Sequence, residues 1–457
     1  MIVTDKIRFK LDEEAVHPGI YEHLTYKNPD YFQKMNLGLS VYGVPQTVKT
    51  FQIKDRVLEV MRGEALKIKG YQLAVGNWSP VFEHADHPVR LQYINNDFPL
   101  DEYQEAAIAA VKANRQGVVH AVTSAGKSLI ILKSCVELGQ RALVIVHRKV
   151  LMQQLLEDIE KYIRDEHGNK ITPGIIGNGK LSLGPITIAI DRTLGSHLAE
   201  YRDAFGTVFL DECHLVSADT LLTVVNGLNS RSRFGVSGTL KRKDGKEFLI
   251  FSAFGPIIST IGKDELLEKG RVVPVRVTVL ETETKFDWDS AAEELGPTKA
   301  RALQEKVIAH DPERRALVRG LVATLTQKGQ KTIVLSRYVE PCFEMQRELK
   351  EHYGIEAGVI TGKDAKGALA AYEAMKKGDM KVIFATIGCV STGLSISDLD
   401  NLILISPVYS NELLLHQIRG RLMRTAPGKL FGTLYFLYDQ YIFPYYRLKR
   451  FLKILDS

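Results

Sequence analysis

The chain has 457 residues, of which 45% are hydrophobic and 25% charged, the composition of an ordinary globular protein. Its formal net charge of +6 is only a mild indication of an anionic partner. No apolar run approaches the roughly 18 residues that span a bilayer, and residues 1–6 lack a signal-peptide pattern. The four cysteines form no CxxC pair, which suits a reducing compartment. We therefore expect a soluble, intracellular protein of two to four domains with no membrane partner.

Residues 1–95 lack the strand–helix alternation that is present further along the chain. They contain many aromatic residues and short strand-like runs at 6–11, 47–53, 57–60 and 65–68. We predict that they form a small N-terminal accessory domain of the α+β type.

Residues 96–265 alternate between apolar, strand-like runs and helix-like segments. The expected strands are 118–122, 142–147, 186–190, 208–210 and 234–237. This alternation predicts a parallel, doubly wound sheet, which we take as a first α/β lobe.

A phosphate-binding loop follows the first of these strands, at residues 121–128. The small residues there leave backbone N–H groups free to wrap a phosphate, and residues 129–137 are expected to form the helix behind them. Lys127 would supply charge to the β- and γ-phosphates, and the Ser128 hydroxyl would bind Mg²⁺. The predicted ATP-binding residues of the loop are Thr123, Ser124, Ala125, Gly126, Lys127 and Ser128.

A second motif, Asp211–Glu212–Cys213–His214, follows the β-prone run 207–210. It places Asp211 at the carboxyl end of a strand, where an open α/β sheet binds its ligand. Asp211 would hold Mg²⁺, and Glu212 would orient and deprotonate the attacking water. The alternative is an acidic and solvated strand end. The presence of a phosphate-binding loop at a compatible spacing in the same chain disfavours it.

The second half of the chain repeats the alternation. Residues 266–312 are predicted to be a connection with peripheral structure, and residues 313–457 a second α/β lobe. Asp311 is a candidate cap for the helix that starts at Pro312. The expected strands are 332–335, 357–360, 382–385, 402–405 and 433–437.

The second lobe has no phosphate-binding loop, so it must contribute to a shared site in another way. Arg421 and Arg424 are three residues apart and would project from one face of a helix. Their guanidinium groups are candidates for stabilising charge on a γ-phosphate bound by the first lobe, and Gln417 would help to orient the water or the arginines. The alternative is a basic helix face that binds nucleic acid or water. Together the motifs predict a nucleoside triphosphatase with its site between two lobes.

The series of motifs resembles that of superfamily-2 helicases over roughly residues 98–425. The matching segments are Tyr103–Gln104 (Q element), 123–128 (motif I), 147–149 (Ia), 191–194 (Ib), 211–214 (II, in its DExH form), 237–239 (III), 335–337 (IV), 385–395 (V) and 417–424 (VI). This resemblance implies two RecA-like doubly wound lobes, ATP and Mg²⁺ as cofactors, and adenine recognition by Tyr103 and Gln104.

The resemblance also implies roles for residues outside the nucleotide site. Coupling between hydrolysis and motion would involve His214, Ser237, Thr239 and Gly393. Sequence-independent contacts to DNA phosphates would come from His147, Arg148, Thr193, Arg337, Thr361, Ser391 and Thr392. The alternative for each contact is a strand-end polar residue that satisfies the local backbone.

Within the superfamily, the chain resembles phage DNA helicases of the UvsW type, on the strength of residues 211–214 and 391–396. This likeness implies a monomer that remodels branched or forked duplexes and single strands of DNA. Ser395 departs from the Asp that many members carry in motif V. An RNA helicase, or a DNA-binding scaffold with a degenerate motor, are the alternatives.

The two ends of the chain leave further alternatives open. Residues 26–63 resemble a small domain that precedes XPB-like motors and contacts duplex DNA, although residues 1–95 could instead only pack against the first lobe. Residues 445–453 mix basic and aromatic side chains. We expect them to form an amphipathic helix that packs on the body of the protein, with DNA binding as the alternative.

Overall fold

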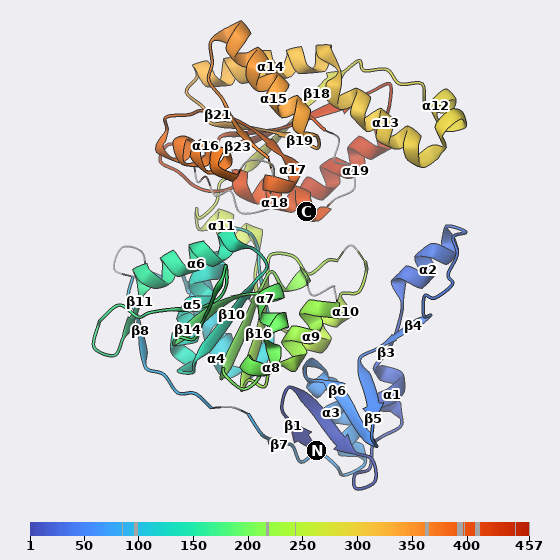
Figure 1. Ribbon diagram of the computed structural model, residues 1–457, viewed down its shortest axis with the longest axis vertical. Coiled ribbons are helices and arrows are strands. Elements are labelled where there is room, and N and C mark those ends of the chain that lie inside the picture. Colours follow the sequence, from blue (N-terminus) through green and yellow to red (C-terminus); the bar gives the residue numbers. More distant parts are fainter. Residues whose placement is uncertain are drawn as a thin grey trace. The chain divides into compact units, whose positions relative to one another are not determined.

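The computed structural model describes residues 1–84, 86–95, 99–215, 219–242, 244–361, 365–390, 396, 398–406, 412–443 and 445–456. The chain divides into two compact units, Met1–Gly262 and Lys263–Ser457 (Figure 1). No helix among these described residues is long and apolar enough to cross a membrane.

The first unit begins with a five-stranded sheet in the order β5-β6-β2-β1-β7. Alternate residues of β2 and β6 point inward, with Ile7, Phe9, Leu58 and Val60 all buried, as expected for a sheet with one solvated face. The strands are β1 (Ile2–Val3), β2 (Lys6–Lys10), β5 (Phe51–Lys54), β6 (Val57–Met61) and β7 (Val81–Phe82), and the helices are α1 (Gly19–His23), the 3-10 turn η1 (Arg62–Glu64) and α3 (Ala65–Ala74).

An arm extends from this small sheet, formed by the hairpin β3 (Thr25–Lys27) and β4 (Thr47–Lys49) and by helix α2 (Pro29–Asn36) at its far end (Figure 1). Helix α2 starts where its sequence predicts a start. The side chain of Asn28 accepts a hydrogen bond from the backbone N–H of Asp30 at 3.2 Å, and Pro29 occupies the first turn.

The remainder of the first unit is built on an eight-stranded sheet in the order β13-β12-β14-β10-β15-β16-β9-β17. All neighbouring strands are parallel except the β12–β13 pair. Residues of β10 are buried along its whole length, as expected for a strand covered on both faces.

The strands of this sheet are β9 (Gln116–Ala121), β10 (Ala142–Val146), β12 (Gly174–Gly177), β13 (Lys180–Ser182), β14 (Ile186–Ile190), β15 (Thr207–Asp211), β16 (Ser232–Ser237) and β17 (Ile257–Ile261). Its helices are α4 (Glu102–Ala113), α5 (Lys127–Leu138), α6 (Lys149–Tyr162), α7 (Asp191–Ser196), α8 (Leu198–Tyr201), the 3-10 turn η2 (Cys213–Leu215), α9 (Asp219–Gly227) and α10 (Phe248–Phe254). A separate pair joins β8 (Leu91–Tyr93) to β11 (Ile163–Asp165).

The small N-terminal sheet is docked on this larger one through buried polar contacts. The guanidinium of Arg62, 2% exposed, donates to the backbone carbonyls of Ser230 and Arg231. Tyr26 of the arm stacks on Phe248 of α10, with ring centroids 4.2 Å apart and planes 6° apart. Residues 1–95 therefore do pack against the first lobe.

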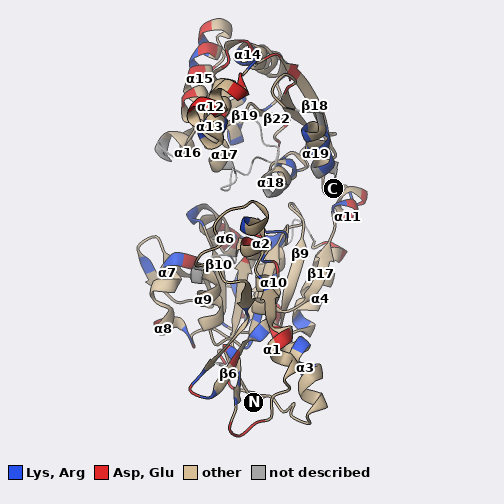
Figure 2. Cartoon of the chain, turned by 90° about the vertical axis from the view of Figure 1, so that its right-hand side faces the viewer, with Lys and Arg blue, Asp and Glu red and all other residues tan. Residues whose placement is uncertain are grey.

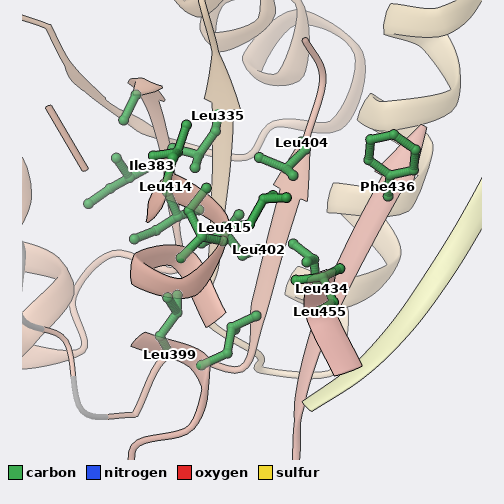
Figure 3. Close-up of a cluster of buried hydrophobic side chains, with 14 of the residues drawn as sticks. Leu335, Ile383, Leu399, Leu402, Leu404, Leu414, Leu415, Leu434, Phe436 and Leu455 are labelled. Atoms are coloured by element: carbon green, nitrogen blue, oxygen red, sulfur yellow. The ribbon is translucent and has the colours of Figure 1, made fainter. Parts of the chain in front are cut away.

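The second unit contains a six-stranded, wholly parallel sheet in the order β18-β23-β22-β19-β21-β20. Its core includes Leu402 and Leu404 of β22 and Leu434 and Phe436 of β23 (Figure 3). The strands are β18 (Val275–Thr282), β19 (Thr332–Ser336), β20 (Gly358–Ile360), β21 (Val382–Thr386), β22 (Asn401–Leu404) and β23 (Gly432–Asp439).

The helices of the second unit are α11 (Lys263–Glu268), α12 (Trp288–Leu295), α13 (Pro297–His310), α14 (Pro312–Gln327), α15 (Val339–Tyr353), α16 (Ala365–Lys377), α17 (Ile387–Val390), α18 (Glu412–Leu422) and α19 (Tyr445–Asp456). The predicted start of α14 is confirmed, because the Asp311 side chain accepts from the backbone N–H of Arg314 at 2.8 Å. Helix α19 packs on the body of the unit, as predicted.

Three sequence expectations of the fold differ from the structure. Residues 47–53, expected as one strand-like run, are divided between β4 and β5, which belong to different sheets. Residues 65–68, expected as a strand, lie in α3, where Ile68 and Gln72 are buried one helical turn apart. Residues 266–312 are more than a connection, because they supply the edge strand β18. A buried cluster holds β18 in place: the Thr282 hydroxyl donates to Asp439 of β23 at 2.6 Å, and Arg314 forms an ion pair with the same carboxylate.

Candidate active site

The phosphate-binding loop joins β9 to α5, as the sequence predicts. Ser124 and Gly126 adopt left-handed conformations, with φ of 74° and 77°, and helix α5 starts at Lys127. Alternation of right- and left-handed residues turns successive N–H groups toward one point. The N-terminus of α5 adds its dipole in the same place, so the loop suits a phosphate anion.

Gln104 of α4 holds the loop from the side. Its Nε2 donates to the Ala125 carbonyl at 3.0 Å, and its Oε1 accepts from the backbone N–H of Asp101 at 3.0 Å. Both ends of the amide are therefore used within the protein, and a Cβ atom added at Gly126 would collide with it. Tyr103, the other predicted adenine contact, is 6% exposed. Adenine recognition by this pair stays a prediction.

The acidic motif lies next to the loop, at the carboxyl end of β15. Asp211 is the last residue of the strand, and Glu212 has a left-handed φ of 54°. This strained conformation for a non-glycine residue turns the Glu212 side chain toward the loop, where its Oε1 lies 3.3 Å from Nζ of Lys127. The structure thus brings together Lys127, Asp211 and Glu212.

The two carboxyl groups differ in their electrostatics. Burial, and then the charge of Glu212, raise the pKa of Asp211 to about 6. Burial alone would also raise the pKa of Glu212, but Lys127 and His214 outweigh it and lower that pKa well below its usual range. Glu212 is therefore ionised at neutral pH, and Asp211 is a half-buried carboxylate that a cation would stabilise.

The predicted coupling residues of the first unit meet at Glu212. The Ser237 hydroxyl donates to the Thr239 carbonyl at 2.6 Å and lies 2.8 Å from Nδ1 of His214 and 3.3 Å from Oε2 of Glu212. Nδ1 of His214 is also 3.3 Å from Oε2 of Glu212. This network connects the end of β16 to the carboxylate at the end of β15.

Sequence reasoning missed Arg242, which extends this network. Arg242 is 7% exposed. Its Nη1 donates to the His214 carbonyl at 3.0 Å, and its Nη2 binds Asp244 at 2.6 Å. The only sequence signal is its position three residues after Thr239. Arg242 fixes the segment after β16 against the acidic motif.

A magnesium ion fits the donors at this site. Ser128 and Asp211 are oxygen donors of the kind that Mg²⁺ prefers, and the half-buried Asp211 carboxyl has a raised pKa that a bound cation would lower. Gly238 leaves room beside the loop, because a Cβ there would lie 3.1 Å from Nζ of Lys127. When bound, Mg²⁺ would neutralise charge on the phosphate oxygens.

The DNA candidates of the first unit follow the carboxyl ends of neighbouring strands. His147 and Arg148 follow β10, and Thr193 is in α7 directly after β14. Burial, and then the charge of Arg148, lower the pKa of His147, and its Nδ1 is buried without a hydrogen-bond partner among the described residues. Their role in DNA binding stays a prediction.

The candidates of the second unit are only partly described. Arg337 follows β19 and forms an ion pair with Glu305, while Thr361 follows β20 and is 4% exposed. Ser391, Thr392 and Gly393, together with the departure at Ser395, lie outside the described residues. Gln417 is within α18, but its side chain is not described.

Arg421 and Arg424 do not share a helix face, contrary to the sequence expectation. Helix α18 ends at Leu422, and Arg424 lies beyond it in an isolated bridge with Val272. The two side chains still influence each other. Burial, and then the charge of Arg424, lower the pKa of Arg421 to about 9, and Nε of Arg421 has no hydrogen-bond partner among the described residues. Two cations brought together in this way favour an anion.

The phosphate-binding loop, the paired carboxylates and the two mainly parallel sheets define a nucleoside triphosphatase of the two-lobed motor class. Residues 97–242 match the family described as type III restriction enzyme, res subunit, and residues 313–426 match the helicase conserved C-terminal domain. The chain is 27% identical to the probable helicase D10 of Escherichia phage T5 over 438 residues, which cover 94% of this chain and 88% of that protein.

Two further comparisons agree with this assignment. The chain is 26% identical to the ATP-dependent DNA helicase uvsW of Enterobacteria phage T4 over 353 residues, which cover 74% of this chain and 68% of that protein. A fragment of a putative HsdR subunit of a type I restriction enzyme from Vibrio vulnificus has a similar fold, with a TM-score of 0.53 and 17% identity, covering 74% of this chain and 65% of that one. The chain belongs to the superfamily-2 helicases and is an ATP-dependent DNA helicase.

Proposed function

We propose that this helicase remodels branched DNA, by migrating junctions and reversing forks, inside the cell in which the DNA replicates or is repaired. The proposal is supported by the similarity to the phage T4 protein whose name is ATP-dependent DNA helicase uvsW. It is also supported by the N-terminal arm, which is the observation that carries it.

The arm presents an apolar tip to solvent. Met35, Leu37, Leu39 and Tyr42 are 50%, 64%, 57% and 96% exposed. Apolar side chains of this kind rarely gather on a free surface without a binding role. Wedge residues inserted between base pairs are a known way of opening a DNA duplex, so we assign the arm tip to the point where strands separate.

The arm is fixed to the ATP-binding lobe close to the catalytic network. Its Asp30 forms an ion pair with Lys246, and its Tyr26 stacks on Phe248. Lys246 follows the segment that Arg242 holds against His214. A wedge held in this manner would move together with the lobe that binds ATP.

ATP and Mg²⁺ would be held by the loop, Ser128 and Asp211. Lys127 would turn from Glu212 to the phosphates, which would leave Glu212 free to orient and deprotonate water. Arg421 and Arg424 would add positive charge in the transition state. The contacts to DNA phosphates by His147, Arg148, Thr193, Arg337, Thr361, Ser391 and Thr392 belong to the same proposal.

The test is a panel of substrates for ATP hydrolysis and strand separation: single strand, blunt duplex, fork, three-way and four-way junction, and the same fork made of RNA. We expect forks and junctions to support the highest rates. Equal activity on RNA and DNA forks would contradict a function confined to branched DNA. Stimulation by single strands alone would contradict the proposed preference for branched DNA.

A further inference from the structure

Helix α19 has a basic outer face that the nucleotide site does not use. Leu448, Phe451 and Leu455 are buried in the core of the second unit, and Phe451 stacks on Phe436 with ring centroids 3.8 Å apart. This packing fixes the rotation of the helix about its axis. The opposite stripe, at spacing i, i+3, i+4 and i+7, is exposed and consists of Tyr446, Lys449, Arg450 and Lys453. Figure 2 shows the blue of Lys and Arg along helix α19.

The stripe is positively charged and carries an open aromatic ring. Tyr446 is 64% exposed. Arg450 and Lys453 are exposed as well. A hydrophobic core explains the inner face of α19 but gives no reason for four cations in a helix with one acidic residue.

A second aromatic and basic pair lies just before the helix. Tyr441 is 59% exposed, and Nζ of Lys285 is 5.8 Å from the centre of its ring. Tyr441 follows β23 and Lys285 follows β18, so both stand at the carboxyl ends of neighbouring parallel strands. The Thr282–Asp439–Arg314 cluster holds these two strand ends rigidly together.

This is the edge of the sheet at which an α/β fold binds its ligands. In the sheet order β18-β23-β22-β19, the end of β18 is three strands away from β19, after which Arg337 stands. At about 4.8 Å per strand, that is roughly 14 Å along one edge. Exposed rings interleaved with cations are the composition that binds single strands, whose bases stack on aromatic side chains.

We infer that Tyr441, Tyr446 and the cations Lys285, Lys449, Arg450 and Lys453 form a binding surface for single-stranded DNA on the second unit. The inference rests on the DNA helicase activity and adds a strand contact outside the helicase motifs. Charge would bind the phosphates and the two tyrosines would stack with bases, so the surface is independent of sequence.

The test measures binding of oligo(dT) and of a blunt duplex to the full-length protein without ATP, over a series of salt concentrations. The variant Lys449→Glu/Arg450→Glu/Lys453→Glu should bind oligo(dT) more weakly, with a salt slope smaller by about 2, because each lost phosphate contact removes about 0.7 for single strands. Tyr446→Ala should weaken oligo(dT) binding about tenfold and leave duplex binding unchanged.

The matched control is Lys328→Glu/Lys376→Glu/Lys377→Glu, which makes the same change in net charge at exposed positions of the same unit. These lysines precede β19 and β21 and therefore lie toward the opposite edge of the sheet. Identical affinity and salt slope for the two triple variants would overturn the inference. So would an equal loss of duplex binding together with no effect of Tyr446→Ala, which would mark a duplex-backbone surface.

The binding assay is independent of the proposed function. Basal ATP hydrolysis without DNA should be unchanged in every variant, because none of the substituted residues belongs to the nucleotide site. Failure of forks to stimulate the wild-type enzyme would refute the preference for branched DNA and leave the oligo(dT) result standing.

Discussion

At the scale of single residues, the nucleotide site contains a close pair of opposite charges. Nζ of Lys127 lies 3.3 Å from Oε1 of Glu212, so the cation proposed to bind phosphate is paired with the carboxylate proposed to activate water. Nucleotide binding would exchange this partner for the phosphates.

Lys127→Ala should reduce ATP hydrolysis by roughly 100-fold or more, since a fixed charge at the transferring phosphate is lost. Binding of DNA should be largely intact, because Lys127 faces the phosphate-binding loop. Steady-state ATPase and oligonucleotide binding measure the two effects. Near wild-type turnover would show that the site is assigned wrongly.

Glu212→Gln should bind ATP and DNA yet turn over roughly a thousandfold more slowly, because a general base is removed. The amide no longer competes with phosphate for Lys127, so nucleotide affinity should be equal or tighter. Equilibrium binding of a fluorescent ATP analogue and single-turnover hydrolysis separate the two parameters. If the variant lost Mg²⁺-dependent nucleotide binding but still bound nucleotide without metal, Glu212 would be the Mg²⁺ ligand and Asp211 the general base.

At the scale of elements, Asp5 links the N-terminal sheet to the first lobe. It is 5% exposed and lies 3.0 Å from Arg8 and 3.3 Å from Arg202. Burial alone would raise the pKa of Asp5, but the hydrogen bonds from Arg8 and Thr4 outweigh it and hold that pKa at about 2, below the ordinary 3.8. This carboxylate therefore stabilises the folded state above pH 4 by about 2 kcal/mol.

The pH dependence of the stability lost in the Asp5→Asn variant follows from the lowered pKa of Asp5. The folded pKa is depressed, so the stabilisation is complete above the unfolded pKa and is lost as the pH falls from about 4 toward 2. Urea unfolding of wild type and variant should differ at neutral pH and converge in acid. A difference that stays constant across that range would show that packing, and not charge, explains the effect.

Elements with strong periodicity could be predicted from the sequence, and weaker ones could not. Buried parallel strands such as β10 and β19 appear as continuous apolar runs. Residues 65–68 form too short an apolar run to distinguish a strand from a helix. In the structure they belong to helix α3, which buries Ile68. Val275, Val277 and Val279 of β18 alternate with other residues, as expected for a strand. The charged residues that follow them made the segment resemble a connection.

The site was predictable where chemistry demands a fixed local spacing, as in residues 123–128 and 211–214. The placement of Arg424 outside α18, and the bond from Arg242 to the His214 carbonyl, depend on tertiary packing. No local pattern encodes such contacts, because the partners are distant in sequence or bind through the backbone.

At the scale of the whole molecule, the role of residues 1–95 is best tested without deleting them. Deletion would expose the surface that Arg62 and Tyr26 cover, and Gly63 packs so closely on α10 that an added Cβ would collide with the Phe251 carbonyl. A truncated protein would therefore lose stability whether or not the arm contacts DNA.

Substitutions at the arm tip can distinguish a role of residues 1–95 in DNA binding from a role in packing alone. Leu37→Ser/Leu39→Ser/Tyr42→Ser alters side chains that are 57% or more exposed, so folding should be unaffected. We expect unwinding of forks to fall severalfold, because the variant lacks the apolar wedge, while single-strand-stimulated ATPase is retained. Lys10→Ser/Glu13→Ser, which removes an exposed ion pair of the same domain, is the control and should behave as wild type. Unchanged fork unwinding by the tip variant would indicate that residues 1–95 only pack against the first lobe.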